Sequence, residues 1–176
     1  GQKVPDKKFS YIDVSAIDKE RGKIAEPQVL TPDAAPSRAR KIVQKGDVIY
    51  SCVRPYLLNI AVVEEEFRPE PIVSTAFAVL NGLGFVLPHY LWIVLRSSYF
   101  VGCVEEKMRG QAYPAINDGA FAPLPVPLAP LLEQHRIVAK ADELMGLCDE
   151  LESRLSSTTV TRRQLLEATL SEAITL

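Results

Sequence analysis

A polar loop predicted between residues 109 and 117 carries side chains that can read the edges of DNA bases. Its sequence, RGQAYPAIN, supplies Arg109, Gln111 and Asn117. Side chains of these three types can make paired hydrogen bonds to one base, which lets a protein distinguish base pairs in the major groove. The same composition also suits a polar loop that only closes a domain, so residue types alone leave both interpretations open.

A second candidate segment surrounds the rigid Pro55, with Arg54 before the proline and Tyr56 after it. A residue that precedes proline is disfavoured in helical geometry, so the backbone of Arg54 is predicted to be extended. The candidates for base contact are therefore Arg54, Arg109, Gln111 and Asn117. Tyrosine side chains commonly bind phosphates, and Tyr56 and Tyr113 are also predicted to contact DNA.

Cations and small hydroxyls suited to phosphate binding lie in two further segments. The stretch SRARKIVQKGD supplies Arg38, Arg40, Lys41 and Lys45, and the apolar stretch PIVSTAFAVL contains Ser74 and Thr75. A solvated strand edge rich in cations would look the same. If the assignments hold, Gln111→Ala alters which sequence is bound, while Lys41→Ala weakens binding to all sequences alike.

The charge of the whole chain bounds the class of protein. Residues 1–130 hold 15 Lys/Arg and 14 Asp/Glu, a net charge of +1, and residues 131–176 hold 5 and 8, a net charge of −3. Neither part has the strongly basic footprint of a DNA-binding domain that acts alone. Contacts with nucleic acid must then be local, or other subunits must supply positive charge.

Other compositional signals predict a cytoplasmic protein without membrane segments. The longest apolar run, residues 85–95, is too short to span a bilayer, and it contains Pro88 and His89. No signal-peptide pattern opens the chain. The three cysteines are widely separated and odd in number, which argues against a disulfide framework or a zinc site.

Most catalytic chemistries lack the residues that they need. The sequence has no phosphate-binding glycine loop, no Pro-Pro pair of the kind used to grip an adenine amino group, and only two histidines, both explained by predicted helix starts. One nominal metal-nuclease set remains, formed by Asp33, Glu105 and Lys107. We therefore predict no catalytic residues, no bound metal and no cofactor in this chain, and keep a metal-dependent nuclease as an alternative.

The order of predicted elements indicates an α+β fold, a mixed β-rich globular domain followed by one long helix. Residues 9–17 and 71–82 each read as one strand, and residues 39–67 contain two or three more. Residues 88–110 read as helix, turn, helix. Residues 111–121 are predicted to form a loop. The proline-rich stretch 122–130 is predicted to be an extended arm.

The final segment is predicted to form a helix of about 65 Å, at 1.5 Å per residue, from Pro130 to about residue 173. Its apolar residues recur with alternating spacings of four and three, the heptad pattern of a coiled coil. They are Ile137, Ala141, Leu144, Cys148, Leu151 and Leu155. An amphipathic helix that folds back on its own domain is the alternative.

These segments resemble one known family. The stretch PLPVPLAPLLEQHRIVAKADELMGLCDELESRL resembles the linker and helix of the specificity (S) subunit of type I restriction-modification enzymes. The stretches APSRARKIVQKGDVIYSCVRPYLLNIAVV, IVSTAFAVL and MRGQAYPAIN resemble the target recognition domain of that family, so the resemblance covers nearly the whole chain.

The resemblance implies a non-catalytic subunit in which each recognition domain reads one half of a bipartite target in double-stranded DNA. It implies that the long helices pair as an antiparallel coiled coil and dock the modification (M) subunits. These carry S-adenosylmethionine and methylate adenine, and restriction (R) subunits join through them. Residues 1–128 are then the target recognition domain and residues 129–176 the spacer helix.

A complete S subunit of this family has two recognition domains and two helices, and this sequence has one of each. It is therefore either part of a longer subunit, whose second half pairs with it in cis, or a half-subunit that forms a homodimer through the helix. A coiled-coil adaptor without sequence preference for DNA is a further alternative.

Overall fold

A computed structural model describes residues 2–110 and 113–174, with side chains except at Leu165 and 168–174. The chain divides into two compact units, Gly1–His135 and Arg136–Leu176. The described strands and three short α-helices belong to the first unit, and the second unit is helical. The α+β class expected from the sequence is confirmed. The functional boundary between residues 128 and 129 stays a prediction.

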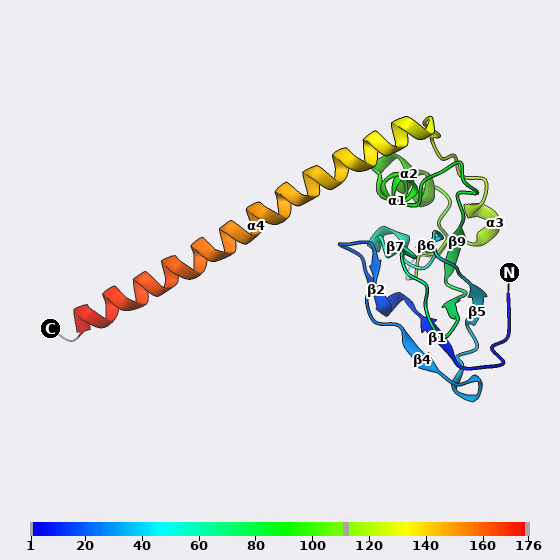
Figure 1. Ribbon diagram of the computed structural model, residues 1–176, viewed down its shortest axis with the longest axis horizontal. Coiled ribbons are helices and arrows are strands. Elements are labelled where there is room, and N and C mark those ends of the chain that lie inside the picture. The colour runs from blue at the N-terminus through cyan, green and yellow to red at the C-terminus, as the bar shows by residue number, and fades with distance from the viewer. Residues whose placement is uncertain (1, 111–112, 175–176) are drawn as a thin grey trace. The chain divides into compact units, whose positions relative to one another are not determined.

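In the described part of the first unit the strands form three sheets. Figure 1 labels most of these strands. A four-stranded sheet has the order β4-β1-β8-β5, from β4 (Gln28–Leu30), β1 (Phe9–Ile12), β8 (Pro71–Ser74) and β5 (Ala39–Ile42). A three-stranded sheet has the order β7-β6-β9, from β7 (Ile60–Val62), β6 (Val48–Ser51) and β9 (Phe77–Leu80). The short strands β2 (Ile17–Asp18) and β3 (Lys23–Ile24) form a separate antiparallel pair.

Burial on both faces explains why the strand patterns are irregular in sequence. All four residues of β1 and all four residues of β6 are buried, so these strands do not alternate apolar and polar residues. β1 pairs with β8 in parallel and with β4 antiparallel, whereas β6 pairs antiparallel with both of its neighbours. β5 pairs antiparallel with β8, with a register shift between Ala39 and Lys41.

The prediction of one strand over residues 71–82 is wrong. The segment forms β8 and β9, which belong to different sheets. The break lies at Thr75 and Ala76, where the Ser74 hydroxyl accepts a hydrogen bond from the Ala76 N–H at 3.3 Å. Serine side chains stabilise turns in this way, because they offer the backbone a local acceptor in place of a sheet partner.

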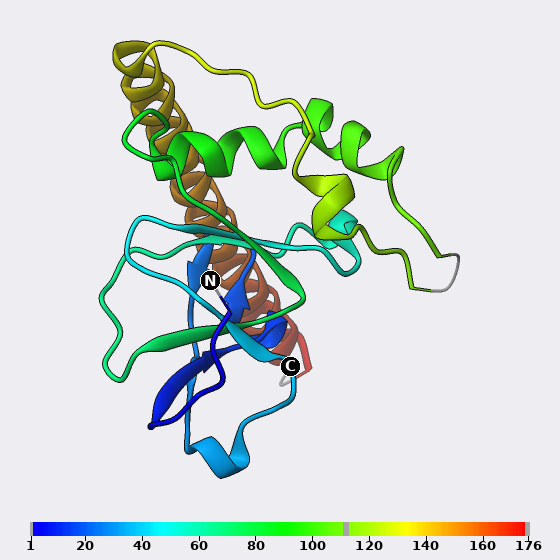
Figure 2. The same cartoon turned by 90° about the vertical axis from the view of Figure 1, so that its right-hand side faces the viewer.

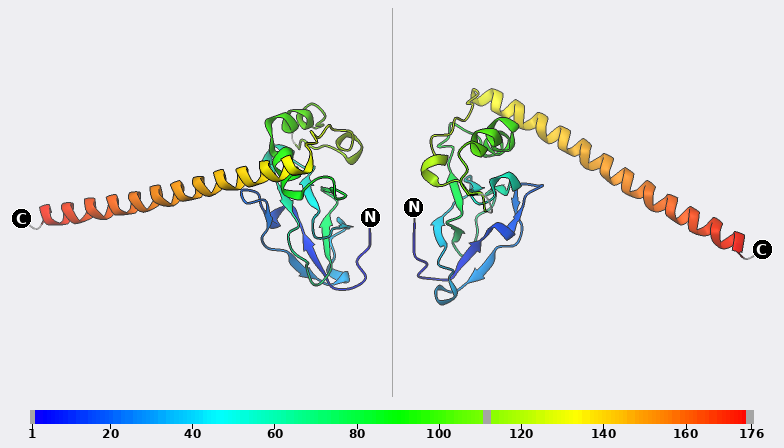
Figure 3. Two further views of the ribbon diagram at one scale, coloured as in Figure 1. Left: turned by 45° about the horizontal axis from the view of Figure 1, so that its top comes forward. Right: turned by 180° about the vertical axis from the view of Figure 1, so that it is seen from behind.

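The predicted helix, turn and helix are confirmed as α1 (Pro88–Arg96) and α2 (Ser98–Glu105). Ser97 caps α2, since its hydroxyl accepts a hydrogen bond from the Phe100 N–H. The predicted loop over 111–121 also contains a short helix, α3 (Asp118–Phe121). Figures 2 and 3 show these helices at one end of the first unit, with β1 and β4 at the other end.

An aromatic cluster joins the helices to the three-stranded sheet. The ring of Phe121 lies 4.8 Å from that of Tyr50 and 5.8 Å from that of Phe100, measured between centroids. All three residues are buried in the core. The cluster therefore fixes α2 and α3 against β6, and with them the segment that lies between the two helices.

The long helix α4 spans Leu131–Ile174, and its first turn belongs to the first unit. It begins one residue later than predicted, with Pro130 supplying the carbonyl that accepts from the Gln134 N–H. The helix continues through the Ser/Thr-rich stretch at 156–161, where hydroxyls bond to carbonyls three or four residues earlier. Of the helices that the structure describes, none combines the length and apolarity that crossing a membrane requires.

Candidate nucleic-acid interface

Arg54 occupies a left-handed backbone conformation, with φ 47° and ψ 56°. The extended geometry predicted from Pro55 is therefore wrong. The short 3-10 turn Pro55–Leu57 lies between Arg54 and Leu58, and Leu58 is left-handed as well, with φ 55°. A left-handed conformation costs a residue other than glycine about 1 kcal/mol or more. Surrounding contacts must therefore hold Arg54 and Leu58 in this turn.

A short backbone ladder supplies those contacts. The Arg54 N–H donates to the Pro114 carbonyl at 2.8 Å, and the Ile116 N–H donates to the Cys52 carbonyl at 3.0 Å. Arg109 and Ala115 exchange two backbone hydrogen bonds, both of 2.9 Å. The segment from Tyr113 to Ile116 therefore lies between Arg109 and the Cys52–Arg54 segment. Figure 2 shows the turn after Arg54 beside α3.

The ladder brings together three of the predicted DNA-binding residues. The guanidinium carbon of Arg54 lies 4.8 Å from the centroid of the Tyr113 ring, a stacked cation–π arrangement. Tyr113 is 69% exposed, and Arg109 is also exposed. Stacking holds the guanidinium in one orientation while its N–H groups stay available, which suits recognition of a planar, polar ligand such as a base edge.

Apolar side chains border this pair, and the sequence analysis missed two of them. Tyr56 and Leu57 are exposed on the turn that follows Arg54, and Val53, directly before Arg54, is exposed as well. Exposed apolar groups beside arginine and tyrosine provide contact surface for thymine methyl groups or for base faces. The sequence CVRPYL did not indicate that Val53 and Leu57 are exposed. In a strand, these apolar residues would lie on one face and would be expected in the core.

Backbone hydrogen bonds link Arg38 and Thr75 to the same region. The Thr75 N–H donates to the Arg38 carbonyl, and the Cys52 N–H donates to the Ala76 carbonyl, both at 2.8 Å. The β8–β9 turn therefore lies between two segments. On one side it bonds to the residue before β5, and on the other side it bonds to the Cys52–Arg54 segment. Arg38 and Thr75 are both exposed. This candidate surface consists of Arg38, Arg54, Tyr56, Thr75, Arg109 and Tyr113.

The structure separates the other predicted phosphate ligands from this surface. Ser74 is fully buried and bonds to Ala76, so a phosphate contact from its side chain does not fit this fold. Lys45 is exposed on the β5–β6 turn, at the opposite end of β5 from Arg38. Arg40 is half-buried and donates to its neighbour, the Ala39 carbonyl. The basic cluster read from the sequence is therefore not one cluster in space.

Lys41 is also committed to contacts within the protein. Its side chain is 12% exposed, and its ammonium group donates to Asp118 Oδ2 and to the Phe77 carbonyl, both at 2.7 Å. A phosphate would have to displace one of these acceptors. The prediction that Lys41 binds a phosphate does not fit this arrangement.

Asn117 has a structural role in addition to its predicted one. Its side-chain oxygen caps α3, accepting from the Ala120 N–H at 2.8 Å. A paired contact with adenine needs that oxygen, so Asn117 can offer a base only its amide N–H groups while the cap is in place. Gln111, the remaining candidate, lies outside the described residues.

Nucleophilic and metal chemistry find little support among the described residues. Burial raises the pKa of the Cys52 thiol to about 11, which keeps the thiol protonated at neutral pH. Asp33 lies on the short 3-10 helix that follows β4, at the opposite end of the first unit from Glu105 in α2, as Figure 1 shows. In the described part of the chain, no group of three or more His, Cys, Asp or Glu residues could hold a metal ion.

The second unit presents the predicted heptad residues at its surface. Leu144, Cys148, Leu151 and Leu155 are exposed, and Ile137 and Ala141 are partly exposed. Leu147 is also exposed and lies about 60° around the helix from Leu144, at 100° per residue, which widens the apolar stripe. A stripe of this kind is typical of a helix that packs against another helix.

Comparisons with known proteins give a consistent result. No protein-family model matches the sequence. The chain is 25% identical over 157 residues to the type I restriction enzyme EcoDI specificity subunit of Escherichia coli, covering 89% of this chain and 34% of that protein. A solved HsdS subunit from Thermoanaerobacter tengcongensis is 40% identical, with a TM-score of 0.75 over 85% of this chain and 40% of that one.

A second solved structure, from work on complex assembly and conformational transition of the type I R-M system, is 37% identical. It has a TM-score of 0.85 and covers 98% of this chain and 45% of that one. The chain is related to type I restriction specificity subunits. It spans about a third of the length of EcoDI and less than half of either solved chain.

Proposed function

We propose that this chain is one DNA-reading unit of a type I restriction-modification specificity subunit. Residues 1–128 read one half of a bipartite DNA target, and residues 129–176 form the spacer helix. The chain positions methyltransferase subunits and carries no catalytic residues of its own. The observation that supports this most strongly is the similarity over 98% of the chain, at 37% identity, to a structure from a type I R-M system.

The geometry of the first unit supports the reading role. Backbone hydrogen bonds bring together four separate segments that carry the half-buried Arg54 and exposed arginine, tyrosine and threonine side chains. Arg38 and Thr75 are suited to phosphates, and Arg54 and Arg109 to base edges. The small number of cations on this surface fits a module whose remaining affinity for DNA comes from partner subunits.

The partners follow from the same proposal. The apolar stripe of α4 pairs with a second helix, in cis within a longer subunit or in trans in a homodimer. The modification subunit holds S-adenosylmethionine and methylates adenine, and the restriction subunit joins through it.

The first experiment is co-expression of the full-length subunit that contains this chain with the modification subunit from the same genome, followed by mapping of methylated adenines. We expect a discrete bipartite motif, palindromic if two copies of this unit pair and asymmetric if a different second reader is present. Direct binding of the modification subunit without any motif would contradict a reading role and favour a coiled-coil adaptor.

Arg54 tests the reading role at one residue. Arg54→Lys should lower affinity for the cognate duplex about tenfold to a hundredfold and relax selection at one base position, since lysine cannot replace a stacked, forked guanidinium. Affinity for single-substituted duplexes, measured by fluorescence anisotropy in the assembled complex, checks this. Tyr113→Phe keeps the ring beneath Arg54 and should leave the selection of bases unchanged. An equal loss on every duplex would contradict base reading by Arg54.

The apolar stripe of α4 gives a separate prediction for helix pairing. Leu151→Ala should weaken association by about 2 kcal/mol or more, roughly thirtyfold, because a knob of a coiled-coil seam loses its buried area. Sedimentation equilibrium measures this for a homodimer, and the thermal midpoint of the full subunit measures it for pairing in cis. Glu152→Ala, one residue away and off the stripe, is the control. Equal behaviour of both variants would count against the seam.

A further inference from the structure

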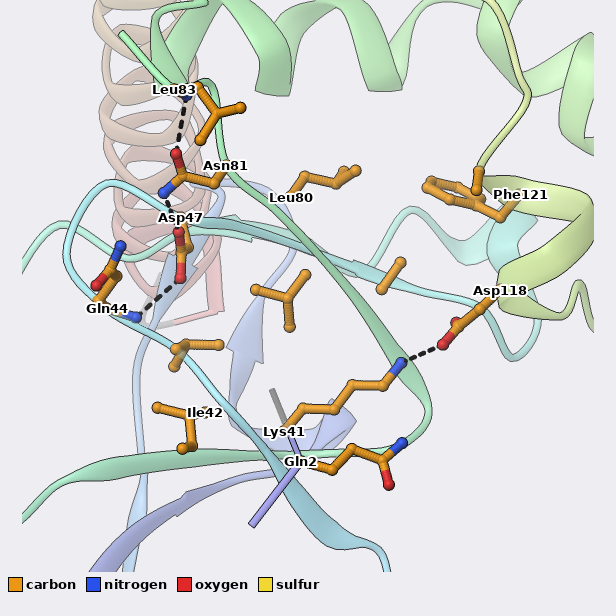
Figure 4. Close-up of a pocket in the computed structure, with 14 residues that line it drawn as sticks. Gln2, Lys41, Ile42, Gln44, Asp47, Leu80, Asn81, Leu83, Asp118 and Phe121 are labelled. Atoms are coloured by element: carbon orange, nitrogen blue, oxygen red, sulfur yellow. Dashed lines mark hydrogen bonds and ion pairs between the residues drawn. The ribbon is translucent and has the colours of Figure 1, made fainter.

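The Lys41–Asp118 ion pair connects the sheet to the end of the candidate DNA-reading loop. Lys41 lies on β5 and borders a groove of about 760 Å³, which Leu80 and Phe121 also line. Figure 4 shows its side chain running from β5 to Asp118 at the start of α3. The ammonium group bonds to Asp118 and to the carbonyl of Phe77, so it joins β5, α3 and β9 at one point.

The two partners differ strongly in exposure. The side chain of Lys41 is 12% exposed and that of Asp118 is 64% exposed. A largely buried ammonium group needs its acceptors, because water cannot replace them at low cost. Asp118 is therefore held by a fixed cation, rather than by a mobile surface lysine that would contribute little to its position.

The position of Asp118 matters because it directly follows the reading loop. Asn117 caps α3 and Asp118 is its first residue. Phe121 anchors the other end of α3 in the aromatic cluster with Tyr50. The buried Ile116, two residues before Asp118, also donates to the Cys52 carbonyl and ties the backbone before α3 to the Cys52–Arg54 segment. The Lys41–Asp118 bond adds a side-chain attachment at this end of α3, which joins the first turn of the helix to β5 and β9.

We infer that Lys41 and Asp118 are positioning residues that set the DNA sequence preference without contacting DNA. The pair fixes the first turn of α3 against β5 and β9, and so fixes the loop that presents Tyr113 to Arg54. This inference rests on the proposed function. It assigns Lys41 a role different from the phosphate contact expected from its sequence neighbours, and it assigns a role to Asp118, which the sequence analysis did not single out.

The test compares Lys41→Met, Asp118→Asn and the double variant in the full-length subunit assembled with its modification subunit. The probes are the duplex defined by wild-type methylation and duplexes with one base pair changed. Each single variant should lower the ratio of cognate to substituted affinity about tenfold. The double variant should lose no more than either single one, because both substitutions break the same contact.

A phosphate-contact role for Lys41 predicts a different pattern. Lys41→Met would then weaken all duplexes alike and reduce the salt slope by about one, as expected for the control Arg38→Met at an exposed cation of the candidate surface. Asp118→Asn would instead strengthen binding, because it removes a negative charge near DNA. Either result, or wild-type discrimination in both single variants, would overturn the inference. Absence of discrimination in the wild type would overturn the proposed function itself, and the inference with it.

Discussion

Gly22→Ala should lower the free energy of unfolding of the chain by about 3 kcal/mol. Gly22 has φ +67°, a conformation that disfavours any side chain, which accounts for about 1 kcal/mol of this effect. The larger part is steric. An added Cβ would lie 2.3 Å from Nε1 and 2.4 Å from Cε2 of Trp92, well inside van der Waals contact.

Neither side of this contact can move away easily. Trp92 Nε1 donates to the Ile60 carbonyl at 3.1 Å, and the Arg96 guanidinium stacks over the indole at 4.7 Å from the centroid. On the other side, the Gly22 carbonyl accepts from the Val62 N–H at 2.9 Å. A shift large enough to admit a methyl group would break one of these hydrogen bonds, which hold the β2–β3 pair and α1 against β7.

Urea unfolding of the chain, followed by circular dichroism, measures the effect. Gly46→Ala is the matched control, because Gly46 has φ +91° and nothing lies within 4 Å of an added Cβ. That variant should lose only the conformational part, about 1 kcal/mol. Trp92→Phe in the Gly22→Ala background should recover part of the loss, since phenylalanine lacks the indole ring nitrogen. Equal losses for Gly22→Ala and Gly46→Ala would show that the steric contact is unimportant.

Features set by local chemistry could be predicted from the sequence. Pro88 opens α1 and Ser97 caps α2, because both preferences act within one turn of the helix. The capping of α3 by Asn117 could have been predicted by the same rule from Asn117-Asp118, and the loop assignment overlooked it. The comparisons support the family assignment, whose most specific signal was the EQHRIVAK stretch.

Features set by distant partners could not be predicted in this way. The rule for residues before proline predicts an extended Arg54, but a hydrogen bond to Pro114, sixty residues away, holds it left-handed. Lys41 belongs to a run of cations in the sequence, and only the fold brings Asp118, 77 residues later, to its ammonium group. Local composition therefore indicated what kind of ligand the site suits, but not which cations remain available for it.

Gln134→Met should lower the free energy of unfolding by about 3 kcal/mol, although methionine has nearly the same length and is apolar. Gln134 is fully buried at the first turn of α4. Its oxygen accepts from the Leu87 N–H at 2.8 Å, and its amide nitrogen donates to the carbonyls of Phe85 at 2.9 Å and Ala129 at 2.8 Å. Methionine would leave one donor and two acceptors without their partner.

Hydrogen exchange gives a local measurement of this loss. The Leu87 amide should exchange faster in Gln134→Met, because its acceptor is the Gln134 side chain. The Phe100 amide bonds to Ser97, so its exchange should speed up only as far as the global stability falls. His135→Met is the matched control, since His135 is the exposed neighbour on the same turn. A similar stability of the two variants would contradict the role given to Gln134.

Gln134→Glu extends the argument to pH. An ionised carboxylate would face the Phe85 and Ala129 carbonyls without a hydrogen to donate, so burial and repulsion should raise its pKa in the folded state. A proton then binds the folded state more tightly than the unfolded state. Relative to the wild type, the variant should be least impaired below the unfolded-state pKa of glutamic acid, near 4.3, and lose stability as the pH rises above it. A stability difference from the wild type that stays constant between pH 4 and pH 8 would show that the carboxylate reaches water, and that the contacts of Gln134 do not hold the first turn of α4.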